Sequence, residues 1–265
     1  MADASTGGRS SAAAVGRSFR VERFAALPST NDAALDRARA GDAGNLWIVA
    51  DRQTSGRGRR GRVWVSESGN LYATALLIDP CEPMRLAELP FVAVVAAQRA
   101  VATQVAGGDG RVKIKWPNDL LVDGAKAAGI LLESTRLPDG RNAVAVGIGI
   151  NCSRAPGGTE TVATSLLACG ANVFPEVLFE DLTTAFAEVV ALWDGGRGFA
   201  AVRAEWLAHA GGIGGRIRVR LIDREEKGVF EAIDDTGRLV LRCEDGTRKA
   251  ISAGDVFFPA SAGTE

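Results

Sequence analysis

The stretch DRQTSGRGRRGRVW, residues 51–64, holds three glycines and five arginines in fourteen positions. The apolar run LWIVA (residues 46–50) leads directly into it, and LYATALLI (residues 71–78) follows it. Both runs are short and apolar, as buried strands are, and residues 63–66 read as a further short strand. The sequence therefore predicts a glycine- and arginine-rich loop that connects strands of one sheet.

This loop has the composition of an anion-binding site. Gly56, Gly58 and Gly61 lack the β-carbons that would keep the backbone away from a ligand, so their amides can donate to anionic oxygens. Arg57 and Arg59, on alternate positions, could each form bidentate hydrogen bonds to a phosphate. Two other interpretations are a flexible, solvated charged loop and an RNA-binding segment.

The overall composition argues against nucleic acid and membrane partners. The chain has 31 basic and 32 acidic residues, and its single tyrosine offers little for stacking on RNA bases. The longest apolar stretch (residues 91–102) is interrupted by Gln98 and Arg99, and it is shorter than the roughly 20 residues that span a bilayer. We therefore predict no nucleic acid and no membrane among the partners.

The four cysteines form no CxxC pair, and one histidine cannot complete a common zinc set. We interpret the cysteines as reduced thiols of a cytoplasmic protein. Residues 1–18 are small and polar and lack the apolar core of a signal peptide, so they predict a disordered tail.

Two folded domains are expected after this tail. Residues 19–210 combine strand signals with three helices, predicted over residues 33–40, over about 85–105 and from residue 175 onward. Ser29 and Asp32 resemble a capping box before the first helix. From residue 211 the sequence pattern changes to five short strand signals separated by turns, which predicts a small β-barrel over residues 211–265.

A second cluster of polar residues lies around KWPND (residues 115–119). This motif places an amide and a carboxylate at the end of a strand, and Lys126 follows the hairpin turn Asp123-Gly124. The strand AVAVGIGIN (residues 143–151) is dense in glycine, where backbone or ligand must approach closely. No GxxxxGK[ST] or GxGxxG motif is present, so the loop at residues 56–62 is the candidate phosphate cradle.

Taken in order, several motifs resemble those of the biotin protein ligases: STN (29–31), DRQTSGRGRRGRVW (51–64), KWPNDLL and KAAGILLE (115–133), GIGIN (147–151) and ATSL (163–166). The resemblance runs from about residue 19 to the C-terminus, where GVFEAIDDTGRLVL and ISAGDV look like the family's small domain. It implies an α+β fold with a mixed β-sheet flanked by helices, like the class II aminoacyl-tRNA synthetases, and a C-terminal SH3-like barrel.

The same resemblance implies a two-step reaction in which biotin and MgATP give biotinyl-5′-adenylate, and a carrier lysine then takes the biotin. The implied catalytic residues are Arg57, Arg59 and Lys126. The implied biotin contacts are Ser29, Thr30, Asn31, Gln53, Gly56, Arg57, Arg59, Lys126 and Gly129. The implied nucleotide contacts are Arg57, Trp64, Lys115, Asn118 and Asn151, with Asn118 or Asp119 as possible Mg²⁺ ligands. Trp64 is equally well interpreted as a core aromatic residue.

The resemblance also implies the partners. The acceptor would be the biotin carboxyl carrier domain of an acetyl-CoA or acyl-CoA carboxylase or of pyruvate carboxylase, and the chain would be a homodimer or a monomer. Only a short tail precedes Phe19, so we expect the monofunctional type, without sequence-specific DNA binding. Ala127 stands where the family usually has leucine, which predicts a packing difference. A lipoate or octanoyl ligase relative and an RNA-binding module remain the alternatives.

Overall fold

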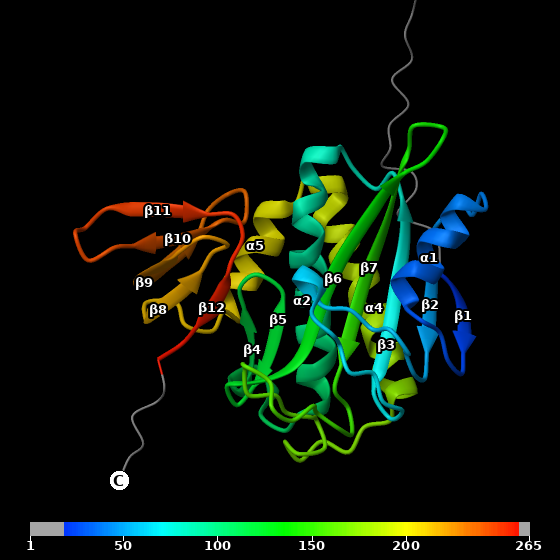
Figure 1. Cartoon of the computed structure of the whole chain (residues 1–265), viewed down its shortest axis with the longest axis horizontal. Coiled ribbons are helices and arrows are strands. Elements are labelled where there is room, and N and C mark those ends of the chain that lie inside the picture. Colours follow the sequence, from blue (N-terminus) through cyan, green and yellow to red (C-terminus); the bar gives the residue numbers. More distant parts are fainter. Residues whose placement is uncertain (1–18, 260–265) are drawn as a thin grey trace, which may run out of the picture.

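The computed structural model describes residues 19–259. Figure 1 shows a larger part, in which helices flank a central sheet, and a smaller β-domain beside it. The expected tail at residues 1–18 lies outside the described residues, as do residues 260–265.

The central sheet has seven strands in the order β1-β2-β3-β7-β6-β5-β4. β1 and β2 are parallel, and every other neighbouring pair is antiparallel, so the predicted mixed sheet is confirmed. The strands are β1 (Arg20–Phe24), β2 (Leu46–Ala50), β3 (Leu71–Ile78), β4 (Val112–Lys115), β5 (Asp119–Val122), β6 (Ala125–Arg136) and β7 (Asn142–Ile150).

Helices cover both faces of this sheet. On one face lie α2 (Leu89–Gln104), α4 (Pro175–Trp193) and α5 (Phe199–Ala208), and on the other lies α1 (Thr30–Arg39). Because both faces are covered, β2 and β3 are buried along their whole length, which explains their continuous apolar runs. The remaining helical segments are η2 (Arg59–Gly61), η3 (Pro83–Glu88), α3 (Gly108–Arg111) and η4 (Asp194–Gly196).

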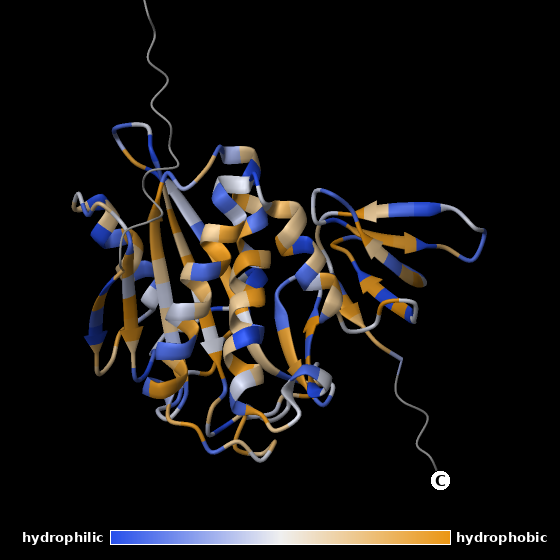
Figure 2. Ribbon diagram, turned by 180° about the vertical axis from the view of Figure 1, so that it is seen from behind, coloured by the Kyte–Doolittle hydropathy of each residue, from blue (hydrophilic) through white to orange (hydrophobic). Residues whose placement is uncertain are grey.

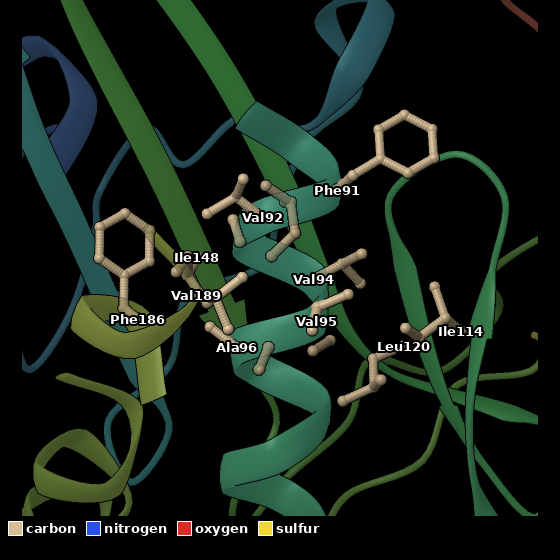
Figure 3. Packing of buried hydrophobic residues seen from close by; sticks show 14 of the residues in the cluster. Phe91, Val92, Val94, Val95, Ala96, Ile114, Leu120, Ile148, Phe186 and Val189 are labelled. Atoms are coloured by element: carbon tan, nitrogen blue, oxygen red, sulfur yellow. The ribbon is translucent and has the colours of Figure 1, made fainter. Parts of the chain in front are cut away.

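The main core is built around α2. Figure 3 shows this helix between α4, which contributes Phe186 and Val189, and the β4–β5 hairpin, which contributes Ile114 and Leu120. The segment Pro83–Gln104 is long and apolar enough to cross a membrane by length and composition alone, but 67% of its apolar window is buried inside the fold. It is apolar almost all round because α4, α5 and the sheet surround it.

The small domain contains the five short strands predicted for an SH3-like barrel, and they form one antiparallel sheet in the order β11-β10-β9-β8-β12. Its strands are β8 (Arg216–Arg220), β9 (Glu225–Ile233), β10 (Leu239–Arg242), β11 (Arg248–Ile251) and β12 (Asp255–Phe257). In Figure 2 apolar residues follow the strands of both sheets, whereas the end of the small domain farthest from the large one is mostly polar. A domain boundary at residue 211 stays a prediction, within the segment between α5 and β8.

The two parts share one continuous core. The indole of Trp206 on α5 lies 5.8 Å from the ring of Phe91 on α2 and 6.4 Å from Phe230 on β9, measured between ring centroids. Trp116 donates from Nε1 to the carbonyl of Gly237 in the small domain, at 3.0 Å. The small domain is therefore held against α2 and α5 by buried aromatic contacts.

Some predicted elements differ from the structure. Residues 63–66 form no strand; Val63 makes a single bridge to Arg57, because the loop folds back on itself there. The first helix begins at Thr30, three residues earlier than predicted, and the second begins as η3 before α2 starts at Leu89.

We expect Trp206→Ala to lower the free energy of unfolding by about 3–5 kcal/mol, because it leaves a cavity between the two parts. Urea denaturation followed by circular dichroism measures this. The control is Ile222→Ala, at a side chain that is 94% exposed, and it should change stability by less than about 0.5 kcal/mol. Similar losses in both variants would contradict the shared core.

Candidate functional site

A cavity of about 250 Å³ lies between the glycine–arginine loop, the sheet and the small domain. Every site residue predicted from the sequence lines it, except Gly56. Gly56 is buried at the base of the loop, where an added Cβ would lie 2.5 Å from both Ser66 Oγ and the Trp64 carbonyl oxygen. The structure thus brings together motifs that are about a hundred residues apart in the sequence.

The floor of the cavity is made of glycines on neighbouring strands. Gly149 on β7 pairs with Gly129 on β6, and two residues earlier Gly147 pairs with Leu131. An added Cβ at Gly149 would lie 2.8 Å from Trp64 Nε1, and one at Gly147 would lie 2.4 Å from Asn31 Oδ1. The predicted close approach is therefore made by two side chains that lie flat on the sheet.

One end of the cavity is lined by polar, uncharged side chains, beside the ion-paired Arg57. Ser29 caps α1, and its Oγ accepts from the backbone amide of Asp32 at 3.4 Å. The amide of Thr30 donates to Gln53 Oε1 at 2.9 Å, and the Thr30 hydroxyl lies 3.1 Å from the same oxygen. Gln53 thereby joins the start of the loop to the first turn of α1.

Arg57 lies close to this end and is anchored by acids. It donates two hydrogen bonds to the Asp32 carboxylate, at 2.8 and 2.6 Å, and lies 3.2 Å from Glu133 Oε2. The hydrogen bonds from Arg57 lower the pKa of Asp32, and those with Asp32 raise the pKa of Arg57. The carboxylate of Asp32 therefore binds Arg57 and does not complete the predicted capping box.

Arg59 points the other way, toward the small domain. It donates to Asn118 Oδ1 at 2.9 Å and to the carbonyl oxygen of Gly254 at 3.1 Å. Burial lowers its pKa, and it forms no ion pair within residues 19–259. Arg57 and Arg59 thus have separate partners, and the charge of Arg59 is the less compensated of the two.

Two lysines add to the charge at this second end. Lys126 Nζ lies 2.6 Å from Asp119 Oδ1 and 5.4 Å from the centre of the Trp64 ring. Lys115 is only 6% exposed, and burial lowers its pKa; its ammonium lies 5.7 Å from the ring of Phe257. Glu160 and Asp255 also line the cavity, but both are paired with arginines. Arg59, Lys115 and Lys126 against Asp119 therefore leave this end positive.

Two asparagines are locked by the backbone. Asn118 donates to the carbonyl of Ile130 on β6, and Asn151 donates to that of Thr164 at 3.1 Å. Asn151 Oδ1 and Trp64 Nε1 are buried without a hydrogen-bond partner. Trp47 Nε1 and Trp206 Nε1 in the core share this property, but of the four residues only Asn151 and Trp64 line the cavity, so these two atoms fit contacts with a polar ligand.

The small domain also holds the loop. Asp255 at the start of β12 forms ion pairs with Arg60 at 3.1 Å, with Arg62, and with Arg220 at 3.3 Å. Sequence reasoning missed this residue, although ISAGDV was noted as a family motif. It also missed Glu133, although this residue ends the quoted motif KAAGILLE, and it missed Thr74, for which the sequence carries no local signal because strand register alone brings it to the site.

The structure gives little support to catalysis by a cysteine nucleophile or to a metal site built from protein side chains. Burial raises the pKa of Cys81 to about 11 and of Cys152 to about 12, so these thiols stay protonated and are poor nucleophiles. Among the residues that the structure describes, no three His, Cys, Asp or Glu side chains form a group that could hold a metal ion.

Comparisons with known proteins match this geometry. Residues 24–153 match the biotin/lipoate A/B protein ligase family, and residues 212–258 match the biotin protein ligase C-terminal domain. The chain is 43% identical over 241 residues to a biotin–[acetyl-CoA-carboxylase] ligase of Paracoccus denitrificans, covering 89% of this chain and 99% of that protein. The chain belongs to the biotin protein ligases.

Further biotin protein ligases resemble the chain less closely. A biotin–[acetyl-CoA-carboxylase] ligase of Mycobacterium tuberculosis is 31% identical over 246 residues, covering 89% of this chain and 88% of that protein. A biotin protein ligase from Aquifex aeolicus, solved with biotin and ATP, has a TM-score of 0.75 at 23% identity and covers 90% of this chain and 97% of its own. That likeness concerns the fold, which is thereby confirmed. These findings do not favour the lipoate ligase or RNA-binding alternatives.

The Asp32–Arg57 pair predicts a pH-dependent stability difference between the wild type and Asp32→Asn. Because the folded pKa of Asp32 is lowered, its contribution is present at neutral pH and is lost as pH falls from about 4 through the folded pKa. The Asp32 side chain is 48% exposed, so we expect at most about 1 kcal/mol at pH 7.

Urea denaturation at pH 7, 5 and 3.5 checks this expectation. Asp36→Asn on the same helix is the matched control, because Asp36 also pairs with an arginine, Arg39, but on the exposed side of the helix. A difference for Asp32→Asn that grows toward low pH would have the wrong sign for a carboxylate stabilised by Arg57.

Proposed function

We propose that this chain joins biotin to a lysine of a biotin carboxyl carrier domain in two steps. In the first, a carboxylate oxygen of biotin attacks the α-phosphorus of ATP, the bond to the β-phosphate oxygen breaks, and pyrophosphate leaves. In the second, the carrier lysine attacks the acyl carbon of biotinyl-5′-adenylate, and AMP leaves. Relatives named as acetyl-CoA-carboxylase ligases support this reaction for the present chain.

The observation that carries the proposal is the change of polarity along the glycine floor. The uncharged side chain of Asn31 lies over the Gly147 position with Thr30 next to it, Trp64 lies over Gly149, and Lys126 lies beyond it on β6. Strand residues advance about 3.3 Å each, so the polarity changes over a distance of on the order of 10 Å. A ligand with a neutral polar ring at one end and a carboxylate at the other matches this order.

The cationic end provides what the first step requires. A carboxylate that approaches a triphosphate is repelled, so fixed positive charge must compensate the charge that builds on phosphorus. We assign Lys126 to the biotin carboxylate and the α-phosphate, and Arg59 with Lys115 to the remaining phosphate charge. Because Asp32 and Glu133 already balance Arg57, we assign it the smaller share of phosphate neutralisation and the larger share of holding the loop.

The nucleotide would lie against Trp64, Asn118 and Asn151, whose unpartnered Oδ1 offers an acceptor. Magnesium enters as MgATP, and Asn118 or Asp119 would supply it with the oxygen ligands that it prefers. We further propose that the enzyme acts in the cytoplasm, as a homodimer or monomer, on the carrier domain of an acetyl-CoA, acyl-CoA or pyruvate carboxylase.

The first test is calorimetric titration of biotin, followed by measurement of pyrophosphate release from ATP with and without biotin. We expect biotin to bind and pyrophosphate release to depend on it. Lys126→Ala should slow this release on the order of 10²-fold, because it removes a cation from the reacting carboxylate.

Lys113→Ala is the matched control. Lys113 lies on the same sheet and does not line the cavity; its ammonium donates to the backbone carbonyl of Asp109. A folded wild-type protein that binds no biotin would refute the proposal. Equal rates of pyrophosphate release in Lys126→Ala and Lys113→Ala would contradict the role assigned to Lys126.

A further inference from the structure

A chain of buried polar groups lies behind the uncharged end of the cavity. Thr74 on β3 is 0% exposed and does not line the cavity, whereas Thr30 and Asn31 do. Its Oγ1 lies 2.8 Å from Thr30 Oγ1 and 2.7 Å from Asn31 Oδ1. Thr74 pairs with Gly147 across the sheet, and the missing side chain of that glycine makes room for Asn31.

The orientation of Asn31 is fixed by groups that can only accept. Its Nδ2 lies 2.8 Å from Glu133 Oε2 and 3.3 Å from the carbonyl oxygen of Leu131. The amide nitrogen must therefore face these two oxygens, and Asn31 Oδ1 faces Thr74. Because Oδ1 is an acceptor, the short contact with Thr74 requires the hydroxyl proton of Thr74.

The hydroxyl proton of Thr30 is then directed at Thr74. With its own proton directed at Asn31, Thr74 can only accept from Thr30 across their 2.8 Å contact. The remaining contact, from Thr30 Oγ1 to Gln53 Oε1, is the longest at 3.1 Å, and Gln53 Oε1 already accepts the Thr30 amide. The two hydroxyl protons, of Thr74 and Thr30, are shared among three oxygen–oxygen contacts. The longest contact, from Thr30 to Gln53, is therefore the one left without a proton.

The Gln53 carboxamide cannot flip to place its nitrogen, a donor, toward Thr30. Its Nε2 donates to Ser66 Oγ at 3.0 Å, and Ser66 in turn donates to the carbonyl oxygen of Trp64 at 3.0 Å. The carbonyl oxygen of Trp64 accepts only, so Ser66 must accept from Gln53, and the carboxamide oxygen must face Thr30. Thr30 therefore keeps free lone pairs, and its hydroxyl presents an acceptor.

We propose that Thr74 is a specificity-determining residue that acts through Thr30. By taking the Thr30 proton, it fixes that hydroxyl as an acceptor for one N–H of the biotin ureido ring. This inference rests on the proposed function. A hydroxyl free to rotate would accept or donate as the ligand demands, whereas one with a committed proton rejects a ring that places an acceptor there.

The probes are two cyclic carbamate analogues of biotin, each with a ring oxygen in place of one ureido N–H. Wild-type protein should prefer biotin to one of them on the order of 10³-fold, because that analogue sets two acceptors against each other. In Thr74→Val the Thr30 proton keeps only the longer 3.1 Å contact to Gln53 Oε1, which it can leave for the analogue. We expect this preference to fall at least about tenfold.

Competition calorimetry on the full chain measures the ratio of the two dissociation constants, which a general loss of packing would not change selectively. Thr74→Ser keeps the hydroxyl and should keep the wild-type ratio, and Thr74→Ala replaces the valine variant if that does not fold. The inference is overturned if the ratio of dissociation constants is unchanged in the variant without the hydroxyl, or if the wild type does not discriminate between biotin and the analogues. In either case, biotin binding by the wild type still upholds the proposed function. A wild type that binds no biotin refutes both.

Discussion

The site depends on one steric condition, the absence of side chains at three positions of the central sheet. Gly129, Gly147 and Gly149 leave a flat floor on β6 and β7. Asn31 and Trp64 lie on it at distances that no β-carbon at Gly147 or Gly149 would allow, and a β-carbon at Gly129 would be tight against Trp64, at 3.1 Å. Asn31 belongs to the first turn of α1, and Trp64 ends the glycine–arginine loop. The floor therefore brings the helix and the loop to the same stretch of sheet, where they form the cavity walls.

The loop is then held from two sides by charge. Arg57 at its beginning pairs with Asp32 on α1, and Arg60 and Arg62 pair with Asp255 in the small domain. Arg59 lies between these anchors without a carboxylate of its own. Two acids pair with Arg57, whereas Arg60 and Arg62 share the single carboxylate of Asp255. The loop thus presents Arg59 to the cavity while its neighbours tie it to both domains. This division of labour explains why so many arginines occur in one short segment.

Local signals predicted most of the fold, because strands and turns depend on nearby residues. The apolar runs at residues 46–50 and 71–78, the turn at Asp123-Gly124 and the five short C-terminal strands were all found in this way. The strand predicted at residues 63–66 was wrong, since Trp64 instead closes the base of the loop by donating to Gly56. Glu133 and Asp255 stand in the quoted motifs KAAGILLE and ISAGDV, but their contacts could not be predicted, because register and domain packing bring them to the site. Thr74 carried no such signal.

The two ends of the cavity recognise ligands by different physics. Cations act over several ångströms and tolerate small shifts, so Lys115, Lys126 and Arg59 can serve phosphate groups that change position during a reaction. A neutral ring offers no such long-range attraction, and its recognition depends on whether each polar atom meets a donor or an acceptor. That choice is stable only if the protons behind it are fixed, and a buried network fixes them because an unpaired polar group there is costly. The Glu133–Asn31–Thr74–Thr30 chain ends in a carboxylate, which can only accept. Together with the carbonyl oxygen of Leu131, it sets the direction of every proton up to the cavity wall.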